Sequence, residues 1–252
     1  MADIEMHRWT TSDGVGLVFP EVGDGRPVVL VHGLFSDANT NWIKFGAASA
    51  LAAKGFRVIM PDLRAHGASD KPHDPAAYPD GILGSDLEEL VTHLSLHEYD
   101  LGGFSLGART VVQAVGEGLC PRRAVLAGMG LQGLTGWLRR KDFFLDAIAN
   151  FDASDRGDPH WLAIQFMKTM QVDLVAARLL LPTFSDAKPD WLAAFTMPTL
   201  VLCGADDHDN GSAPELAGVL PDGAYVAVPG THMSSVTSRE FGERLAEWLS
   251  AP

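Results

Sequence analysis

Short apolar runs alternate with longer segments of helical periodicity along most of the chain. The short runs are apolar or alternate between apolar and polar positions, and Gly, Pro or Asp bounds several of them, as expected of strands. The strand candidates are residues 5–10, 16–21, 28–32, 57–61, 99–104, 123–127, 199–203 and 224–228. Several are nearly continuous apolar runs, which is typical of parallel strands covered on both faces.

Helical periodicity separates these runs. In the segment 82–96, Leu83, Leu87, Leu90, Val91 and Leu94 fall on one helical face. The other helix candidates are residues 41–54, 106–118, 214–220 and 238–250. Alternation of strands and helices predicts an α/β fold, with parallel strands joined by right-handed crossovers.

The segment 131–195 interrupts the alternation. It contains no convincing strand, it is rich in Trp, Phe and Met, and stretches such as 161–167 and 174–181 have amphipathic helical patterns. We therefore expect an all-helical insertion, here called the cap, between two strands of a core domain formed by residues 1–130 and 196–252. Most of its aromatic side chains should form a small core of their own, and the others should line a pocket.

Charge and composition narrow the functional classes. With 19 Lys and Arg against 32 Asp and Glu, the net charge is −13. This charge argues against nucleic-acid binding and against docking on an anionic membrane. The apolar runs are too short to span a membrane, and the N-terminus has no secretory signal, so we expect a cytoplasmic protein. Cys120 and Cys203 adjoin apolar segments and should be buried free thiols, without metal-ligand spacing.

The strongest chemical signal surrounds Ser105. The sequence Gly102-Gly103-Phe104-Ser105-Leu106-Gly107 follows a strand candidate and precedes a helix candidate. Gly-x-Ser-x-Gly in this setting is a nucleophile elbow, in which the serine occupies a strained turn and the flanking glycines avoid clashes with neighbouring strands. The alternative is an ordinary Gly-rich turn. We expect Ser105 to be a nucleophile and the Leu106 N–H to point into the same space.

A serine that attacks a carbonyl needs a second donor for the oxyanion. The strand candidate 28–32 ends in His32, and Gly33 and Leu34 follow it. The Leu34 N–H is the expected second donor, and Gly33 would allow the backbone to approach the substrate. His32 is interpreted as a structural hydrogen-bonding group rather than a proton carrier.

The nucleophile also needs a base and an acid that orients the base. Of nine histidines, His232 follows the last strand candidate, at the sheet end where Ser105 should lie, whereas His66 is interpreted as structural. Asp206 and Asp207 follow the strand candidate 199–203, and we favour Asp207 over Asp206. The other possible position, after the strand candidate 123–127, offers no carboxylate before Asp142.

The chain order Ser, Asp, His is that of α/β-hydrolases. With Val31-His-Gly-Leu34, Asp62-Leu-Arg-Ala-His-Gly-Ala-Ser69 and Gly103-Phe-Ser-Leu-Gly107, nearly the whole chain resembles a small, esterase-like enzyme of the α/β-hydrolase fold. The resemblance implies a mostly parallel eight-stranded sheet flanked by helices, with a helical cap after the sixth strand. Two motifs depart from the family pattern: in one, Ala65 and His66 stand in place of Gly and its neighbour, and in the other, Thr231 separates Gly230 from His232.

The predicted activity is hydrolysis of small-molecule carboxylic esters with short to medium apolar acyl or alcohol groups, without a cofactor or metal. The same triad would also support thioester hydrolysis, carbon–carbon bond hydrolysis, or peracid formation as in cofactor-free haloperoxidases. Relatives that attack with Asp are disfavoured because Ser105 occupies the elbow. A catalytically silent binding protein is the alternative from another class, but such proteins usually lose a triad member.

Overall fold

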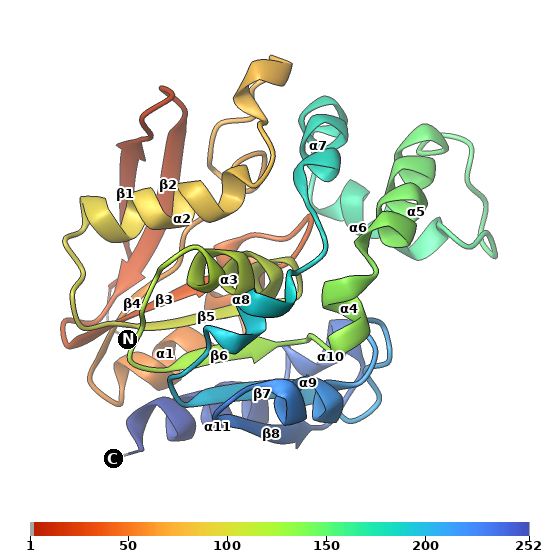
Figure 1. Ribbon diagram of the computed structural model, residues 1–252. Coiled ribbons are helices and arrows are strands. Elements are labelled where there is room, and N and C mark those ends of the chain that lie inside the picture. Colours follow the sequence, from red (N-terminus) through yellow and green to blue (C-terminus); the bar gives the residue numbers. More distant parts are fainter. Residues whose placement is uncertain (1–2, 252) are drawn as a thin grey trace.

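Eight strands form one twisted sheet through the middle of the protein (Figure 1). The computed structural model describes residues 3–251. The strands are β1 Glu5–Thr10, β2 Gly16–Val22, β3 Arg26–Val31, β4 Phe56–Ile59, β5 Asp100–Phe104, β6 Ala124–Ala127, β7 Thr199–Gly204 and β8 Gly223–Val228. Their order is β1-β2-β4-β3-β5-β6-β7-β8. The pairs β1–β2 and β2–β4 are antiparallel and the rest are parallel, which confirms the predicted fold class.

The central strands are buried on both faces. In β3, Val29 and Val31 pack into the core on one side of the sheet, whereas Val28 and Leu30 pack into the core on the other side, and all four are fully buried. Successive side chains of a strand point to opposite faces, so a strand covered twice must be apolar at every position. This explains why the runs of the central strands are continuous in the sequence rather than alternating.

Helices cover both faces of the sheet. The core on one side takes side chains from α2 Ile82–His93, α3 Leu106–Gly116, α8 Pro189–Ala193 and α9 Ala213–Val219. The core on the other side takes them from α1 Ala47–Ala52 and α11 Arg239–Ser250. Figure 1 shows α2 and α3 on the side of the sheet opposite α1 and α11. The carboxyl ends of the parallel strands are therefore the positions where loops can build a site.

Two expectations from the sequence are wrong. The single helix predicted over residues 41–54 is a π-helical turn, η1 Asn39–Ile43, followed by α1, because Gly46 between them adopts a left-handed φ of 88°. Cys120, expected to be buried, is exposed in the loop between α3 and β6, whereas Cys203 at the end of β7 is buried. Both cysteines are free thiols.

The segment between β6 and β7 consists of helices joined by turns and contains no strand. It contains α4 Leu131–Thr135, α5 Trp137–Ala149, α6 Trp161–Thr169, α7 Leu174–Leu180, the 3₁₀ turn η3 Leu181–Thr183, and α8. Side chains such as Trp137, Ile148, Ile164 and Met167 form a hydrophobic cluster that also takes in Phe35 from the loop after β3. In contrast, α8 packs against α3, and Trp191 joins the core of the sheet.

Two short elements complete the described chain: the 3₁₀ turn η2 Pro75–Ala77 and the helix α10 His232–Ser235. Within residues 3–251, no helix has the length and apolar character needed to cross a membrane.

Candidate active site

Ser105 occupies the sharp turn between β5 and α3. Its backbone has φ 54° and ψ −110°, a combination that is strained for a residue with a side chain. Its N–H donates to the Ala127 carbonyl at 2.8 Å, which ties the turn to β6. A Cβ on Gly103 would overlap the backbone of Gly107, and a Cβ on Gly107 would overlap the Val31 carbonyl. The glycines flanking Ser105 are thus required by the turn itself.

His232 connects the Ser105 hydroxyl to a buried carboxylate. The Ser105 Oγ lies 3.1 Å from His232 Nε2, and His232 Nδ1 lies 2.9 Å from Asp207 Oδ2. The side chains of His232 and Asp207 are only 11% and 2% exposed. Since a carboxylate can only accept, Nδ1 carries the proton that it donates to Asp207, and Nε2 is left as an acceptor for the Ser105 hydroxyl. This is the hydrogen-bond order that a serine nucleophile and its base require.

The loop after β7 determines which aspartate reaches the histidine. The Asp207 N–H donates to the Gly204 carbonyl at 3.0 Å, and the Asp206 N–H donates to the Gly230 carbonyl at 3.0 Å. This turn directs Asp207 toward His232 and leaves Asp206 exposed. The structure therefore brings together Ser105, Asp207 and His232, and leaves out Asp206.

Thr231, which separates Gly230 from His232, has a structural explanation. It is the N-cap of α10, where its N–H donates to Ser234 Oγ at 2.8 Å and the two side chains form a capping box. His232 is therefore the first residue of a short helix and not part of a free loop. The Phe104 ring lies 5.0 Å from the imidazole and packs against it. Both features fix the orientation of the ring.

The two expected oxyanion donors flank the nucleophile. Leu34 and Leu106 both line the cavity that contains Ser105. Leu106 is the first residue of α3, where backbone N–H groups have no intrahelical acceptor. The Leu34 N–H has no hydrogen-bond acceptor within residues 3–251. The neighbouring Gly33 N–H donates to Asn41 Oδ1 at 3.0 Å, which fixes the loop from the other side.

Two buried histidines hold this loop against the loop that follows β4. His32 Nδ1 donates to the Gly33 carbonyl at 2.8 Å, and its Nε2 accepts from the Leu63 N–H at 3.0 Å. His66 Nδ1 donates to the Arg64 carbonyl at 2.9 Å, and its Nε2 accepts from the Phe35 N–H at 3.0 Å. The structural interpretation of both histidines fits these bonds, because each ring uses both nitrogens on the backbone.

Burial keeps the two rings neutral. It lowers the pKa of His32 to about 4, and burial together with the nearby His32 lowers the pKa of His66 to about 3. The ring centroids are 5.1 Å apart, so two charged rings would also repel each other. Neutral imidazoles, each with one donor and one acceptor nitrogen, are the form that these hydrogen bonds require.

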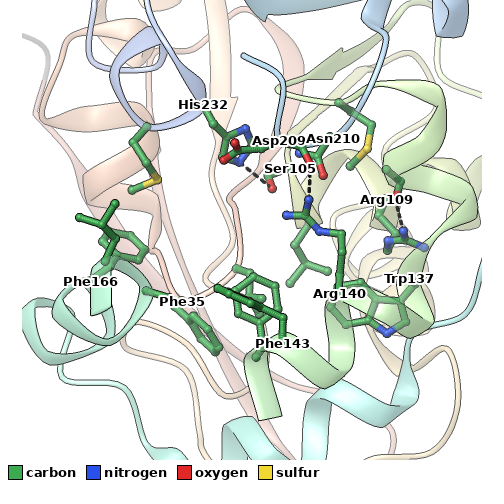
Figure 2. A pocket seen from close by; sticks show the side chains of 18 of the residues that line it. Phe35, Ser105, Arg109, Trp137, Arg140, Phe143, Phe166, Asp209, Asn210 and His232 are labelled. Atoms are coloured by element: carbon green, nitrogen blue, oxygen red, sulfur yellow. Dashed lines mark hydrogen bonds between the residues drawn. The ribbon is translucent and has the colours of Figure 1, made fainter. Parts of the chain in front are cut away.

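A cavity of about 770 Å³ opens above Ser105, between the strand ends and the cap. Its walls are mostly apolar, with Phe35 from the core and Phe143, Leu162 and Phe166 from the cap. Figure 2 shows Ser105 and His232 at one end of this cavity and the aromatic rings of Phe35 and Phe143 at the other. A mostly apolar cavity with a few convergent polar groups is typical of a small-molecule site.

Three arginines line the cavity, Arg109, Arg139 and Arg140, and none of them was predicted from the sequence. Arg109, one helical turn after Ser105, donates to the carbonyls of Gly133, Leu134 and Ser185, and its guanidinium lies over the Trp137 ring. Arg140 on α5 donates to the Asp209 carbonyl. The spacing of Arg109 from Ser105 could have indicated a shared helix face. No sequence signal places Arg140, because its position depends on how the cap packs.

One group of possible metal ligands is found within residues 3–251. It consists of Asp207, Asp209 and His232, whose potential ligand atoms lie within 4.8 Å of one another. Asp207 and His232 are already bonded to each other, and His232 is also bonded to Ser105. Two of the three residues are thus members of the hydrogen-bonded triad, and the third lies beside them because the Asp209 N–H donates to Asp207 Oδ1 at 3.2 Å.

Comparisons with known proteins agree with this architecture. A family model described as the alpha/beta hydrolase fold matches residues 26–161. The chain is 36% identical over 110 residues to a non-heme chloroperoxidase of Kitasatospora aureofaciens, a match that covers 43% of this chain and 38% of that protein. The chain thus spans less than half the length of the curated relatives that it matches.

Solved structures match over nearly the whole chain. A hydrolase of Pseudomonas aeruginosa PA01 has a TM-score of 0.77 and 23% identity, with 98% of this chain and 99% of that chain covered. A thermophilic esterase of Thermogutta terrifontis has a TM-score of 0.76 and 24% identity, with 98% of each chain covered. At these identities the likeness establishes the fold.

Proposed function

The chain belongs to the α/β-hydrolase fold family, and from this premise we propose that it is a serine hydrolase that cleaves small-molecule carboxylic esters. The observation that carries the proposal is the continuous hydrogen-bond path from Ser105 Oγ through His232 to Asp207, with distances of 3.1 and 2.9 Å. Ser105 lies at a strained elbow at the base of an apolar cavity, which is where a carbonyl carbon would have to approach it.

In the proposed mechanism, Ser105 Oγ attacks the carbonyl carbon while His232 Nε2 takes its proton. The N–H groups of Leu34 and Leu106 hold the oxyanion, and Asp207 stabilises the imidazolium. The imidazolium then gives the proton to the leaving alkoxide, and an acyl-enzyme remains on Ser105. Water, activated by His232, attacks the acyl-enzyme and releases the acid, and Ser105 regains its proton.

The curated relatives include a chloroperoxidase and epoxide hydrolases, and these names frame the alternatives. An epoxide-opening mechanism with an aspartate nucleophile is disfavoured, because the elbow residue here is a serine. Peracid formation, thioester hydrolysis and carbon–carbon bond hydrolysis would use the same triad. The apolar cavity favours esters with short to medium apolar groups.

Labelling with a fluorophosphonate probe and assays with p-nitrophenyl butyrate test this proposal together. The wild-type protein should be labelled at Ser105 and should release p-nitrophenol, and Ser105→Ala should do neither. A folded wild-type protein that reacts with neither reagent would overturn the proposal. A thioester, a diketone ring-fission product, and acetate with hydrogen peroxide should each be turned over more slowly than the ester.

A further inference from the structure

The charge of the cavity is opposite to the charge of the chain. The whole sequence carries a net charge of −13. The cavity above Ser105 is nevertheless lined by three arginines, Arg109, Arg139 and Arg140, and by a single carboxylate, that of Asp209. The positive charges still outnumber the negative ones when Asp207, behind His232, is counted. A cleft lined by one sign of charge with low-dielectric walls concentrates ligands of the opposite charge.

The three arginines are not equally available to a ligand. The buried Arg109 guanidinium donates to three backbone carbonyls and lies over Trp137, so most of its N–H donors are used within the protein. Arg139 is an exposed residue. Arg140 donates to the Asp209 carbonyl and to no other acceptor within residues 3–251. A guanidinium has five N–H donors, so Arg140 retains several for a ligand.

Arg140 extends toward the reactive end of the cavity. Its side chain runs from α5 to the segment that carries Asp209 and Asn210, beside Ser105 (Figure 2). Burial lowers the pKa of Arg140, and the charges of Asp209 and Asp207 raise it. Asp207 is engaged by His232, and Asp209 is exposed to solvent. A desolvated guanidinium that remains protonated is stabilised by a further anionic partner.

We propose that the ester substrate carries a separate carboxylate and that Arg140 binds this carboxylate in the cavity. This inference rests on the proposed function, because it names the class of ester that the same site would take. A planar guanidinium pairs with a carboxylate through two parallel hydrogen bonds, which fixes both position and orientation. The apolar side chains of Phe143 and Leu162 would contact the methylene groups between the carboxylate and the ester. Monoesters of short dicarboxylic acids have this structure.

Matched pairs of esters test the preference. Monomethyl adipate and methyl hexanoate have acyl groups of the same length, and they differ in a carboxylate on the acyl side. 4-Acetoxybutanoate and butyl acetate form the corresponding pair for the alcohol side. We expect the wild-type kcat/KM, measured by titration of released acid, to be at least tenfold higher for the anionic member of one pair. A preference for the neutral ester in both pairs would overturn the proposal.

Two variants of α5 separate charge recognition from loss of net charge. Arg140→Gln should lower the preference for the anionic ester by about 10- to 100-fold, the range expected for a hydrogen bond between charged groups. The kcat/KM for the neutral ester should change by less than about threefold. Lys141→Gln removes the same charge from the next residue, which does not line the cavity, and should leave both rates within about twofold. Arg140→Lys, which keeps the charge, should be intermediate. Equal loss with both esters in Arg140→Gln would assign Arg140 to support of the Asp207 loop and overturn the proposal.

A binding measurement keeps this inference separate from the catalytic proposal. Adipate titrated into Ser105→Ala in a calorimeter should bind at least tenfold more tightly than into Ser105→Ala/Arg140→Gln. If no ester is hydrolysed but adipate binding depends on Arg140, the proposed esterase function fails while the carboxylate site stands. If esters are hydrolysed and adipate binds equally to both variants, the carboxylate site fails while the esterase function stands.

Discussion

The conformation of Ser105 places requirements on its neighbours. A residue with a side chain at φ 54° costs about 1 to 3 kcal/mol of strain, which the surrounding structure must offset. The hydrogen bond to Ala127 and the close approach of Gly103 and Gly107 hold the turn. The strained turn places the Ser105 hydroxyl above the end of the sheet, 3.1 Å from His232 Nε2, the nitrogen that would take its proton.

The first prediction concerns the nucleophile. Ser105→Ala should lower kcat for p-nitrophenyl butyrate by about 10⁶-fold, the loss measured when the serine of a comparable triad is removed. The folded protein should persist, because alanine keeps the Cβ at this position and loses only the hydroxyl. Circular dichroism and thermal unfolding provide the control for folding. A variant that keeps more than about a tenth of the wild-type kcat would remove Ser105 from the mechanism.

The second prediction separates the two neighbouring acids. Asp207→Asn should lower kcat about 10⁴-fold, because an amide in this position favours the wrong tautomer of the histidine. Asp206→Asn should change kcat by less than about threefold, since Asp206 is exposed and its described hydrogen bond is made by its backbone N–H. Parallel kcat measurements on the two isosteric variants decide the assignment. A reversed order would move the acid to Asp206 and leave the rest of the mechanism in place.

At the scale of elements, two loops are held together by His32 and His66. His32 follows β3 and His66 lies in the loop after β4. Each ring is hydrogen-bonded to one backbone group of the loop that carries Leu34 and to one backbone group of the loop 62–70. His66 lies in one of the two motifs where the sequence departs from the family pattern. Its ring accepts from the Phe35 N–H, directly after the expected oxyanion donor. The departure thus coincides with support for the site.

The third prediction follows from the pKa of His66. In the folded state burial lowers this pKa from 6.5 to about 3, so between these values the unfolded chain binds more protons than the folded one. The contribution of the neutral His66 ring to the free energy of unfolding is therefore complete above about pH 6.5 and is lost as the pH falls toward 3. Lowering the pH from 7 to 4.5 should remove about 2–3 kcal/mol of the unfolding free energy through His66.

Urea unfolding of His66→Gln at pH 7 and pH 4.5 measures this contribution. The variant should be less sensitive to acid than the wild type, and His97→Gln, which changes an exposed histidine, should match the wild type. The comparison between variants is needed because the pKa of Asp86 is raised by burial to about 6, so this group increases the free energy of unfolding as the pH falls and opposes the effect of His66. If His66→Gln lost as much unfolding free energy on acidification as the wild type, the prediction that folding lowers the pKa of His66 would be wrong.

The elements themselves were largely readable from the sequence. All eight strands were predicted within about two residues, and the central strands were the clearest because burial on both faces leaves a continuous apolar run. The helix predicted over 41–54 failed because the pattern carries no sign that Gly46 would adopt a left-handed φ. Ser105 and His232 were located by their positions after strands, whereas Arg140 was not, since its position results from long-range packing of the cap.

At the scale of the whole molecule, the site lies where the core and the cap meet. The sheet supplies Ser105, Asp207 and His232 from loops after β5, β7 and β8. The cap supplies most of the apolar wall and Arg140. The groups proposed to react and the groups proposed to select the substrate therefore come from different parts of the chain.

The fourth prediction concerns neutral esters in this shared cavity. With a volume of about 770 Å³ and a helical cover, it should accept short to medium chains and exclude long ones. Each methylene that fits should contribute about 0.8 kcal/mol to transition-state binding, which is roughly fourfold in kcat/KM. Along p-nitrophenyl esters from acetate to palmitate, kcat/KM should rise and then fall. A flat profile, or a maximum at palmitate, would instead indicate an open cleft.

Arg109 has a consequence for how this protein can diverge. Its guanidinium donates to the carbonyls of Gly133, Leu134 and Ser185. The first and last parts of the cap are therefore both fixed to one side chain of α3. Doubling the length of a closed flexible loop adds only about 0.6 kcal/mol of entropy cost. We therefore expect insertions into the exposed turns between these anchors to cost little stability, whereas positions that join the core of the sheet, such as Ala176 and Leu180, must keep their contacts. Changes at the residues between the anchors that line the cavity would alter the range of substrates without touching Ser105, Asp207 or His232.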